Sequence, residues 1–258
     1  MATDEPYLYG DDDLAAERLD LVARLFEPST AAFLDRFGPL TPALAIGVGC
    51  GPGHTTRLVH RVLEPHRTLG LDRSDRYVAR AAVDAPAGVA FARHDAREVP
   101  FPESPADVVY CRLLLAHLNR PMDVLAGWAT QLAPGGLLMI DELDRAETDD
   151  PAFRRYLEVA VAVIHGQGST LFAGPVIAAA AAPPGTETGA NETATIELSP
   201  ADAGRMFGMN LRVLRRDGQL PADDPELDGL QASLDAAVAG EVRPTCVLHQ
   251  RQIVYRRA

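Results

Sequence analysis

The hydrophobic positions in the first half of the chain form short apolar runs separated by amphipathic segments. The runs predict strands at residues 43–48, 68–71, 89–92, 106–111 and 137–140. The segments between them predict helices at 55–63, 74–83 and 122–132. Strands that are apolar throughout and alternate with helices are typical of a parallel sheet covered on both faces. The pattern therefore predicts a doubly wound α/β fold.

Further elements are expected on either side of this region. Apolar residues at helical spacing predict an N-terminal helix at 13–34. Beyond residue 141 the regular alternation ends, and the pattern predicts helices at 151–164, 199–216 and 227–238 and strands at 194–198 and 246–255. Two helices between the last two strands indicate a lid over the substrate side of the sheet.

Charge and cysteine content narrow the possible partners and the cellular location. The net charge is −12 and all 24 basic residues are arginine, so an acidic chain without a basic stripe is expected to bind no nucleic acid. The three cysteines form no Cys-x-x-Cys pair, which favours a reduced, cytoplasmic protein without a zinc site. No run approaches the roughly 20 apolar residues of a membrane span, so we expect no membrane partner.

Four glycines alternate at the end of the first predicted strand. Gly47, Gly49, Gly51 and Gly53 lie between an apolar run and a predicted helix, a position where ligands bind in doubly wound sheets. A dinucleotide site has the spacing Gly-x-Gly-x-x-Gly, which this loop lacks, so a nicotinamide oxidoreductase is a disfavoured alternative. Taken alone, the loop could also be only a tight strand-to-helix turn.

Polar residues follow the next strands in a regular order. Asp72 ends the second strand, where a carboxylate can accept both hydroxyl hydrogens of a ribose; the alternative is an acid at a helix N-terminus beside Ser74. Asp95 and Ala96 follow the third strand, at a place suited to an adenine amino group. The segments 106–112 and 132–137 complete the series at the fourth and fifth strands.

These ordered segments resemble the class I S-adenosylmethionine (SAM) dependent methyltransferases, specifically the UbiE-like small-molecule branch. The matching segments are 48–53, 70–74, 94–101, 106–118 and 132–137, and residues 7–10 with 17–19 are similar to the N-terminal cap of some members. The resemblance implies a seven-stranded Rossmann-like sheet whose last strand is antiparallel. We divide the chain accordingly into an N-terminal helical cap (1–40), a SAM-binding core (41–145) and a C-terminal part with the helical lid (146–258).

The resemblance also implies roles for individual residues. The glycine loop would lie under the methionine part of SAM, Asp72 would hold the ribose hydroxyls, and Asp95 with Ala96 would face the adenine. Arg112 would border the methionine end of SAM and the substrate cavity. The full set of cofactor-binding residues expected on this basis is Tyr9, Gly49, Cys50, Gly51, Gly53, Asp72, Arg73, Asp95, Ala96 and Arg112.

A general base is useful when the methyl acceptor is a hydroxyl group. His117, after the fourth strand, is the first candidate, with a packing or capping role as the alternative. His165 is a second candidate, although a histidine at a helix C-terminus also interacts favourably with the helix dipole. Asp141, Glu142 and Asp144 only loosely resemble the acidic cluster of metal-dependent methyltransferases, so we expect a solvated loop there and no metal.

The sequence thus predicts transfer of a methyl group from SAM to an O, N or C atom of a small, apolar or aromatic metabolite, in specialised metabolism; a homodimer is left open. One departure from the family pattern supports an alternative. Gly47 stands where members usually carry an acid, which favours a SAM-binding protein with a cyclase-like or structural role instead of methylation. Asp141 or Glu142 are candidates to compensate for that acid electrostatically.

Overall fold

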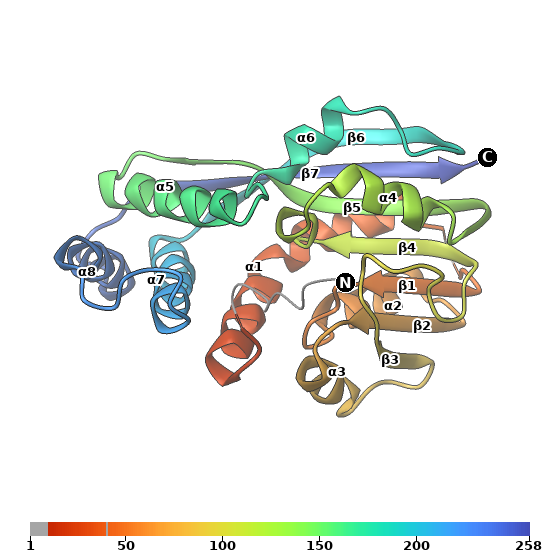
Figure 1. The fold of residues 1–258 in the computed structure, drawn as a ribbon, viewed down its shortest axis with the longest axis horizontal. Helices are drawn as coiled ribbons and strands as arrows, with labels where there is room; N and C mark the ends of the chain where they lie inside the picture. Colours follow the sequence, from red (N-terminus) through yellow and green to blue (C-terminus); the bar gives the residue numbers. More distant parts are fainter. Residues whose placement is uncertain (1–9, 40) are drawn as a thin grey trace.

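A seven-stranded sheet organises the part of the chain that the computed structural model describes, residues 10–39 and 41–258. The strands are β1 (Leu44–Val48), β2 (Arg67–Asp72), β3 (Val89–Arg93), β4 (Ala106–Arg112), β5 (Leu132–Thr148), β6 (Thr186–Leu198) and β7 (Cys246–Arg257). Their order across the sheet is β3-β2-β1-β4-β5-β7-β6 (Figure 1). The strands β1 to β5 pair in parallel, and β7 runs antiparallel to both β5 and β6. The predicted doubly wound sheet with an antiparallel last strand is confirmed.

Helices cover both faces of this sheet. They are α1 (Asp13–Phe37), α2 (His54–Leu63), α3 (Asp75–Ala82), η1, a 3-10 turn (Leu115–His117), α4 (Pro121–Ala129), α5 (Pro151–Gly166), α6 (Ala173–Ala179), α7 (Pro200–Arg216) and α8 (Pro225–Ala239). The C-terminal half of α1 and helix α2 pack on one face, where Phe33 and Leu58 are buried. Helices α4 and α6 pack on the other face, where Trp128 and Ile177 are fully buried. No helix of the described residues is long and apolar enough to cross a membrane.

The predicted helix starts are visible as side-chain caps. Ser199 accepts a hydrogen bond from the backbone N–H of Asp202 at the start of α7, and Asp150 caps α5 in the same way. Ser74 caps α3 through the N–H of Tyr77. A side-chain oxygen at this position satisfies one of the unpaired N–H groups of the first helical turn, which fixes where each helix begins.

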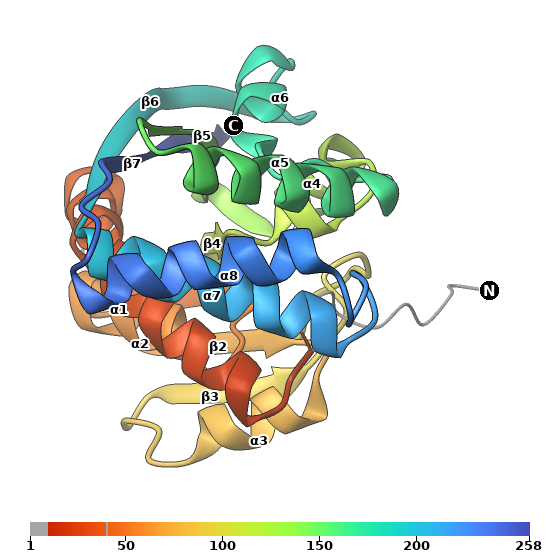
Figure 2. The same ribbon diagram turned by 90° about the vertical axis from the view of Figure 1, so that its left-hand side faces the viewer.

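Three helices form a layer beyond the carboxyl ends of β1 and β4. Helices α5, α7 and α8 gather there together with the N-terminal half of α1 (Figures 1 and 2). Their shared core includes Phe26, Phe153, Phe207 and Leu234, all at most 3% exposed. This layer is the lid that the sequence predicts, and it closes the space over the carboxyl edge of the sheet.

Two strands are much longer than their apolar runs predict. β5 has 17 residues and β6 has 13, whereas the sequence pattern predicts strands only at 137–140 and 194–198. β5 pairs with β4 as far as Asp141 and continues against β7 to Thr148. The added residues of β6 are mostly exposed, so they carry no apolar signal. The sequence pattern predicts no element at the short helix α6.

Candidate active site

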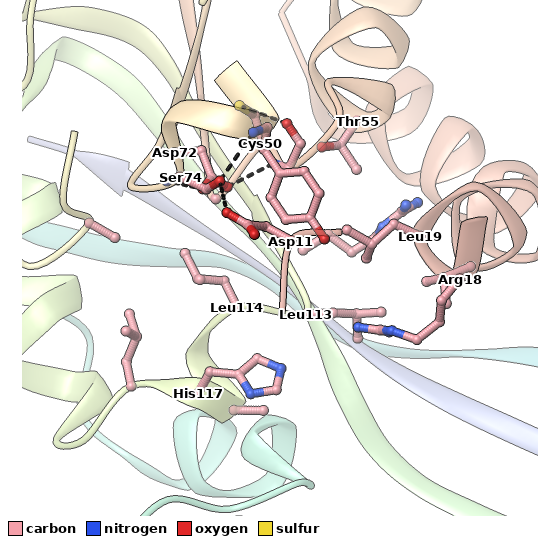
Figure 3. Close-up of a pocket in the computed structure, with 18 of the residues that line it drawn as sticks. Asp11, Arg18, Leu19, Cys50, Thr55, Asp72, Ser74, Leu113, Leu114 and His117 are labelled. Carbon is pink, nitrogen blue, oxygen red and sulfur yellow. Dashed lines mark hydrogen bonds between the residues drawn. The ribbon is translucent and has the colours of Figure 1, made fainter. Parts of the chain in front are cut away.

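A cavity of about 1640 Å³ opens at the carboxyl ends of β1, β2 and β4, beneath the lid. Typical small-molecule pockets have about 300–1,000 Å³, so this space can hold a cofactor and a second molecule together. Figure 3 shows Cys50, Asp72 and Ser74 at one end, which we call the cofactor end, and His117 at the opposite side. The second region, lined by α1, α5 and α7, is the acceptor end.

The glycine loop between β1 and α2 forms one wall of the cofactor end. Gly49, Gly51 and Gly53 have φ values of +67°, +51° and +92°, a conformation that strains residues with a Cβ atom. A Cβ atom on Gly49 would also lie 2.7 Å from Cδ2 of Leu114. The loop backbone is therefore bare where it meets the cavity, through Gly49, Cys50 and Gly51. Gly53 does not line the cavity and begins α2 instead.

Asp72 ties the end of β2 to this loop. Its Oδ2 atom accepts a hydrogen bond of 2.8 Å from the N–H of Gly51, and Oδ1 accepts one of 2.9 Å from the N–H of Ser74. Burial raises the pKa of the Asp72 carboxyl, while these hydrogen bonds act in the opposite direction. Each carboxylate oxygen keeps a further lone pair, so Asp72 can still accept hydrogen bonds from a ribose.

The residues after β3 continue the cofactor end. Asp95 accepts hydrogen bonds from the backbone N–H and the guanidinium of Arg97, and these bonds lower the pKa of Asp95. The carbonyl oxygen of Ala96 accepts a hydrogen bond of 2.7 Å from the Trp128 indole. Both residues line the cavity, as does Arg73. Their polar groups are held by neighbouring side chains, which fixes the shape of this wall.

Arg112 links the cavity to a buried polar cluster. Its Nη1 atom donates to Oγ1 of Thr30 at 3.1 Å, and Thr30 donates to Oδ2 of Asp141 at 2.8 Å. The hydroxyl of Tyr110 donates to the same Asp141 oxygen at 3.2 Å. Burial raises the pKa of Asp141, and the positive charge of Arg112 opposes that shift. Arg112 lines the cavity, and the hydrogen bond to Thr30 fixes the position of its guanidinium group.

His117 ends the turn η1 and lines the cavity. Burial, followed by the positive charges of Arg18 and Arg73, lowers the pKa of His117 from 6.5 to about 3. A general base works best when its pKa lies near the operating pH, so the neutral imidazole is suited to hydrogen bonding and poorly suited to removing a proton. His165 is exposed at the end of α5 and does not line the cavity.

The expectation of a solvated loop at Asp141, Glu142 and Asp144 is wrong. All three lie in β5, and their exposed fractions are 0%, 0% and 6%. Partners distant in sequence allow this burial: Thr30 bonds Asp141, backbone N–H groups bond Glu142, and Arg251 pairs with Asp144 at 2.8 Å. Within residues 10–39 and 41–258, no group of three or more His, Cys, Asp or Glu residues could hold a metal ion.

Nine of the eleven predicted site residues thus line one cavity: Gly49, Cys50, Gly51, Asp72, Arg73, Asp95, Ala96, Arg112 and His117. Tyr9 lies outside the described residues, and Gly53 lies behind the loop. Sequence analysis assigned no cavity role to Phe207 and Asn210 of α7. Asn210 donates a 2.6 Å hydrogen bond to the hydroxyl of Tyr156, whose ring stacks on Phe207 at 4.3 Å. An asparagine on the apolar face of a helix is the signal that could have identified it.

Comparison with known proteins agrees with this arrangement. Residues 46–140 match the family model described as "Methyltransferase domain". Trans-aconitate 2-methyltransferase of Methylobacterium nodulans is 34% identical over 65% of this chain and 60% of the relative. The enzyme of the same name from Streptomyces avermitilis is also 34% identical, over 60% of this chain and 54% of the relative. The chain therefore matches less than two thirds of the length of these relatives.

Solved structures with low sequence identity share the fold. A Bacillus halodurans protein described as a methyltransferase superposes with a TM-score of 0.59 and 14% identity, covering 89% of this chain and 98% of that one. Fold and site together define a class I methyltransferase domain. Residues 46–140 thus form a class I SAM-dependent methyltransferase domain, for which SAM is the cofactor.

The residues at the cofactor end fit SAM. The cradle of Gly49 and Gly51, both with positive φ, lets bare backbone approach a ligand, and a Cβ atom on Gly49 would not fit beside Leu114. The buried carboxylate of Asp72 stands beside that cradle, 2.8 Å from the Gly51 nitrogen. We assign the glycine loop to the methionine part of SAM and Asp72 to its ribose as a proposal that a bound ligand would test.

Proposed function

We propose that this protein transfers the methyl group of SAM to an oxygen atom of a small carboxylate metabolite in the cytoplasm. The observation that carries the proposal is the single cavity, in which the glycine loop and Asp72 share one space with the acceptor end. The relatives named as trans-aconitate 2-methyltransferases support a carboxylic acid as the class of acceptor. Two further features of the acceptor end support it as well: its positive charge and its lack of a strong base.

The charge of the acceptor end favours an anion. Figure 3 shows Arg18 of α1 away from the cofactor end, and Arg112 of β4 lines the same cavity. The lining carboxylates of the described residues, Asp11, Asp72, Asp75, Asp95 and Glu98, belong to the cofactor end. Guanidinium groups bind carboxylates strongly because two parallel hydrogen bonds can form. The remaining lining is largely apolar, with Leu157, Met206 and Leu248 among its residues, which suits a carboxylate with a hydrophobic body.

The low pKa of His117 also favours a carboxylate as the methyl acceptor. An imidazole with a pKa of about 3 cannot activate a hydroxyl group at neutral pH. A carboxylate is already ionised there, so its oxygen needs no base. Bound SAM supplies an electrophilic methyl group; the acceptor oxygen bonds to the methyl carbon as the carbon–sulfur bond breaks, and the electron pair leaves with sulfur.

The protein's own contribution is alignment and exclusion of water. Such a displacement gains most from holding both molecules in line and in a dry site. Arg18 and Arg112 would orient the acceptor, Asp72 and the glycine loop would fix the cofactor, and α7 with Phe207 would close the acceptor end. His117 would hold the acceptor through a hydrogen bond.

A direct experiment tests this function. Calorimetry with SAM, S-adenosylhomocysteine (SAH) and NAD should show binding of the first two and none of NAD. Incubation with SAM and a panel of carboxylic acids, including trans-aconitate and hydrophobic monocarboxylates, should yield methyl esters detected by mass spectrometry. Methylation only of phenols or amines in a matched panel would contradict the carboxylate assignment. Light scattering of the purified protein tests whether it forms a homodimer.

A SAM-binding protein that does not methylate is the second candidate, and Gly47 favours it. A Cβ atom on Gly47 would lie 2.8 Å from Oγ1 of Thr56, so the α2 threonine occupies the place that an acidic side chain would need. SAM binding without a methylated product across the whole panel would support this candidate.

A further inference from the structure

Glu142 lies in β5 beside the segment 113–117, which follows β4 and includes η1. Its side chain is fully buried, and Oε1 accepts hydrogen bonds of 2.8 Å from the N–H groups of both Leu114 and Leu115. No other acceptor is recorded for these two N–H groups in the described part of the chain. The carboxylate therefore anchors this segment to β5, together with the N–H of Leu113, which donates to the carbonyl oxygen of Asp141 at 3.1 Å.

The anchored segment touches both ends of the cavity. The side chain of Leu114 lies against Gly49 of the glycine loop, and His117 lines the acceptor end; Figure 3 shows Leu114 between Asp72 and His117. Leu113 adopts a φ of +53°, which is uncommon for a residue with a branched side chain. Such a conformation persists when surrounding interactions fix it, and the Glu142 hydrogen bonds are adjacent to it.

The second carboxylate oxygen has an unusual environment. Oε2 is buried and forms no hydrogen bond within residues 10–39 and 41–258. Burial raises the pKa of Glu142 to about 7, while the N–H groups of Leu115 and Leu114 act against that shift. The ionised form is therefore held mainly by backbone N–H groups of the segment, those of Leu114 and Leu115 with a smaller contribution from Ala116, and its charge changes near neutral pH.

The side chains around Glu142 do not provide an alternative source for a change of charge near pH 7. The Cys111 thiol of β4 lies 3.9 Å away, and burial raises its pKa well above the usual value. Arg251 of β7 is the register partner of Glu142 in β5, but its side chain forms an ion pair with Asp144. His117 has a pKa of about 3.

Asp141, next to Glu142 in β5, also has a raised pKa, and its negative charge helps to raise that of Glu142. Its side chain bonds Thr30 and Tyr110, while its backbone carbonyl, which does not titrate, accepts a hydrogen bond from the N–H of Leu113. Helix α6, which packs against β5, contains no titratable residue.

We propose that Glu142 is a positioning residue whose ionised carboxylate holds segment 113–117 against the glycine loop, and whose protonation loosens that segment. Hydrogen bonds to a charged acceptor are about twice as strong as those to a neutral one, so the loss of charge weakens both bonds together. The link to cofactor binding rests on the proposed function, because it assumes that the glycine loop holds SAM.

Hydrogen exchange on the full-length protein, measured by NMR or mass spectrometry between pH 6 and 8.5, tests this role. After correction for intrinsic exchange rates, protection of the Leu114 and Leu115 amides should rise about tenfold through pH 7. In Glu142→Gln, protection should stay at the low-pH level throughout. The matched control is Glu147→Gln, on the same strand but with 59% of its side chain exposed, which should keep the wild-type profile.

Two results would overturn the inference: a wild-type profile without a step near pH 7, or a step that survives in Glu142→Gln. The wild-type profile decides the question even if the variant folds poorly. SAH affinity measured over the same pH range should fall below pH 7 in the wild-type protein and change little in Glu142→Gln. A complete failure of SAH to bind would instead refute the proposed function, while the exchange profile would still decide the role of Glu142.

Discussion

The N–H of Gly51 donates a 2.8 Å hydrogen bond to the carboxylate of Asp72, and this bond joins the ends of two neighbouring strands at the cofactor end. Replacing Asp72 with asparagine removes the negative charge and turns one acceptor into a donor. Charge-assisted hydrogen bonds contribute about 1.5–3 kcal/mol, so we expect SAH affinity to fall by roughly ten- to a hundredfold. Calorimetric titration measures this, and Asp123→Asn, whose side chain is 60% exposed and does not line the cavity, is the control. Equal loss in both variants would contradict the assignment.

Gly49 cannot accommodate a side chain. Its φ of +67° and the 2.7 Å approach to Leu114 predict that Gly49→Ala destabilises the protein by at least about 1–2 kcal/mol. Gly229, in α8, has ordinary helical conformation and no neighbour within 4 Å of an added Cβ atom. Gly229→Ala should therefore stabilise the protein by about 0.5–1 kcal/mol. Urea denaturation curves should shift in opposite directions.

Glu142 should make stability depend on pH. Its pKa is about 7 in the folded protein, above its ordinary value of 4.5, so its contribution to stability is fully present below pH 4.5 and is lost as pH rises through 7. The loss has a ceiling of about 3.5 kcal/mol, from about 1.4 kcal/mol per pKa unit. Unfolding free energies from pH 5 to 8.5 should show this fall, and Glu142→Gln should reduce it. Asp72 and Asp141 also have raised pKa values, so some fall of the unfolding free energy with rising pH should remain in Glu142→Gln.

His117 should affect acceptor binding more than proton transfer. A general base contributes about a hundred- to ten-thousandfold to the rate, whereas loss of one hydrogen bond from a neutral imidazole costs about tenfold or less. We expect His117→Gln to stay within tenfold of the wild-type kcat on whichever carboxylate the panel identifies. The pH profile should show no inflection from this histidine between pH 6 and 8. A loss of kcat above a hundredfold would indicate that His117 acts as the general base.

His117 should also affect acid stability, in the opposite sense to Glu142. Its folded pKa of about 3 lies below the ordinary value of 6.5, so its contribution is present above pH 6.5 and is lost as pH falls towards 3. Denaturation of His117→Gln between pH 4 and 7 should show a shallower loss of stability than the wild-type protein. An identical slope would mean that His117 is accessible to solvent.

The cofactor end could be predicted from sequence because its residues follow strands in chain order. The loop 49–53 and Asp72 each come directly after an apolar run, and the carboxyl ends of parallel strands meet at one edge of the sheet. Side-chain periodicity gave those strands to within a few residues, as for β1 and β2. The three-part division of the chain remains a prediction.

The acceptor end and the buried acids could not be predicted in this way. Thr30 and Asp141 are 111 residues apart in sequence, yet a 2.8 Å hydrogen bond joins them. A carboxylate looks like a solvated residue until such a partner is known. Phe207 and Asn210 reach the cavity only because α7 crosses the end of the sheet. Local patterns carry no information about those contacts.

The lid helices α7 and α8 are inserted between β6 and β7, the two strands farthest from the glycine loop in the sheet order. The part of the acceptor end that α7 supplies, with Met206, Phe207 and Asn210, is thus encoded apart from the glycine loop and Asp72. Changes within residues 199–245 can therefore reshape this wall of the cavity while the donor site keeps its own sequence.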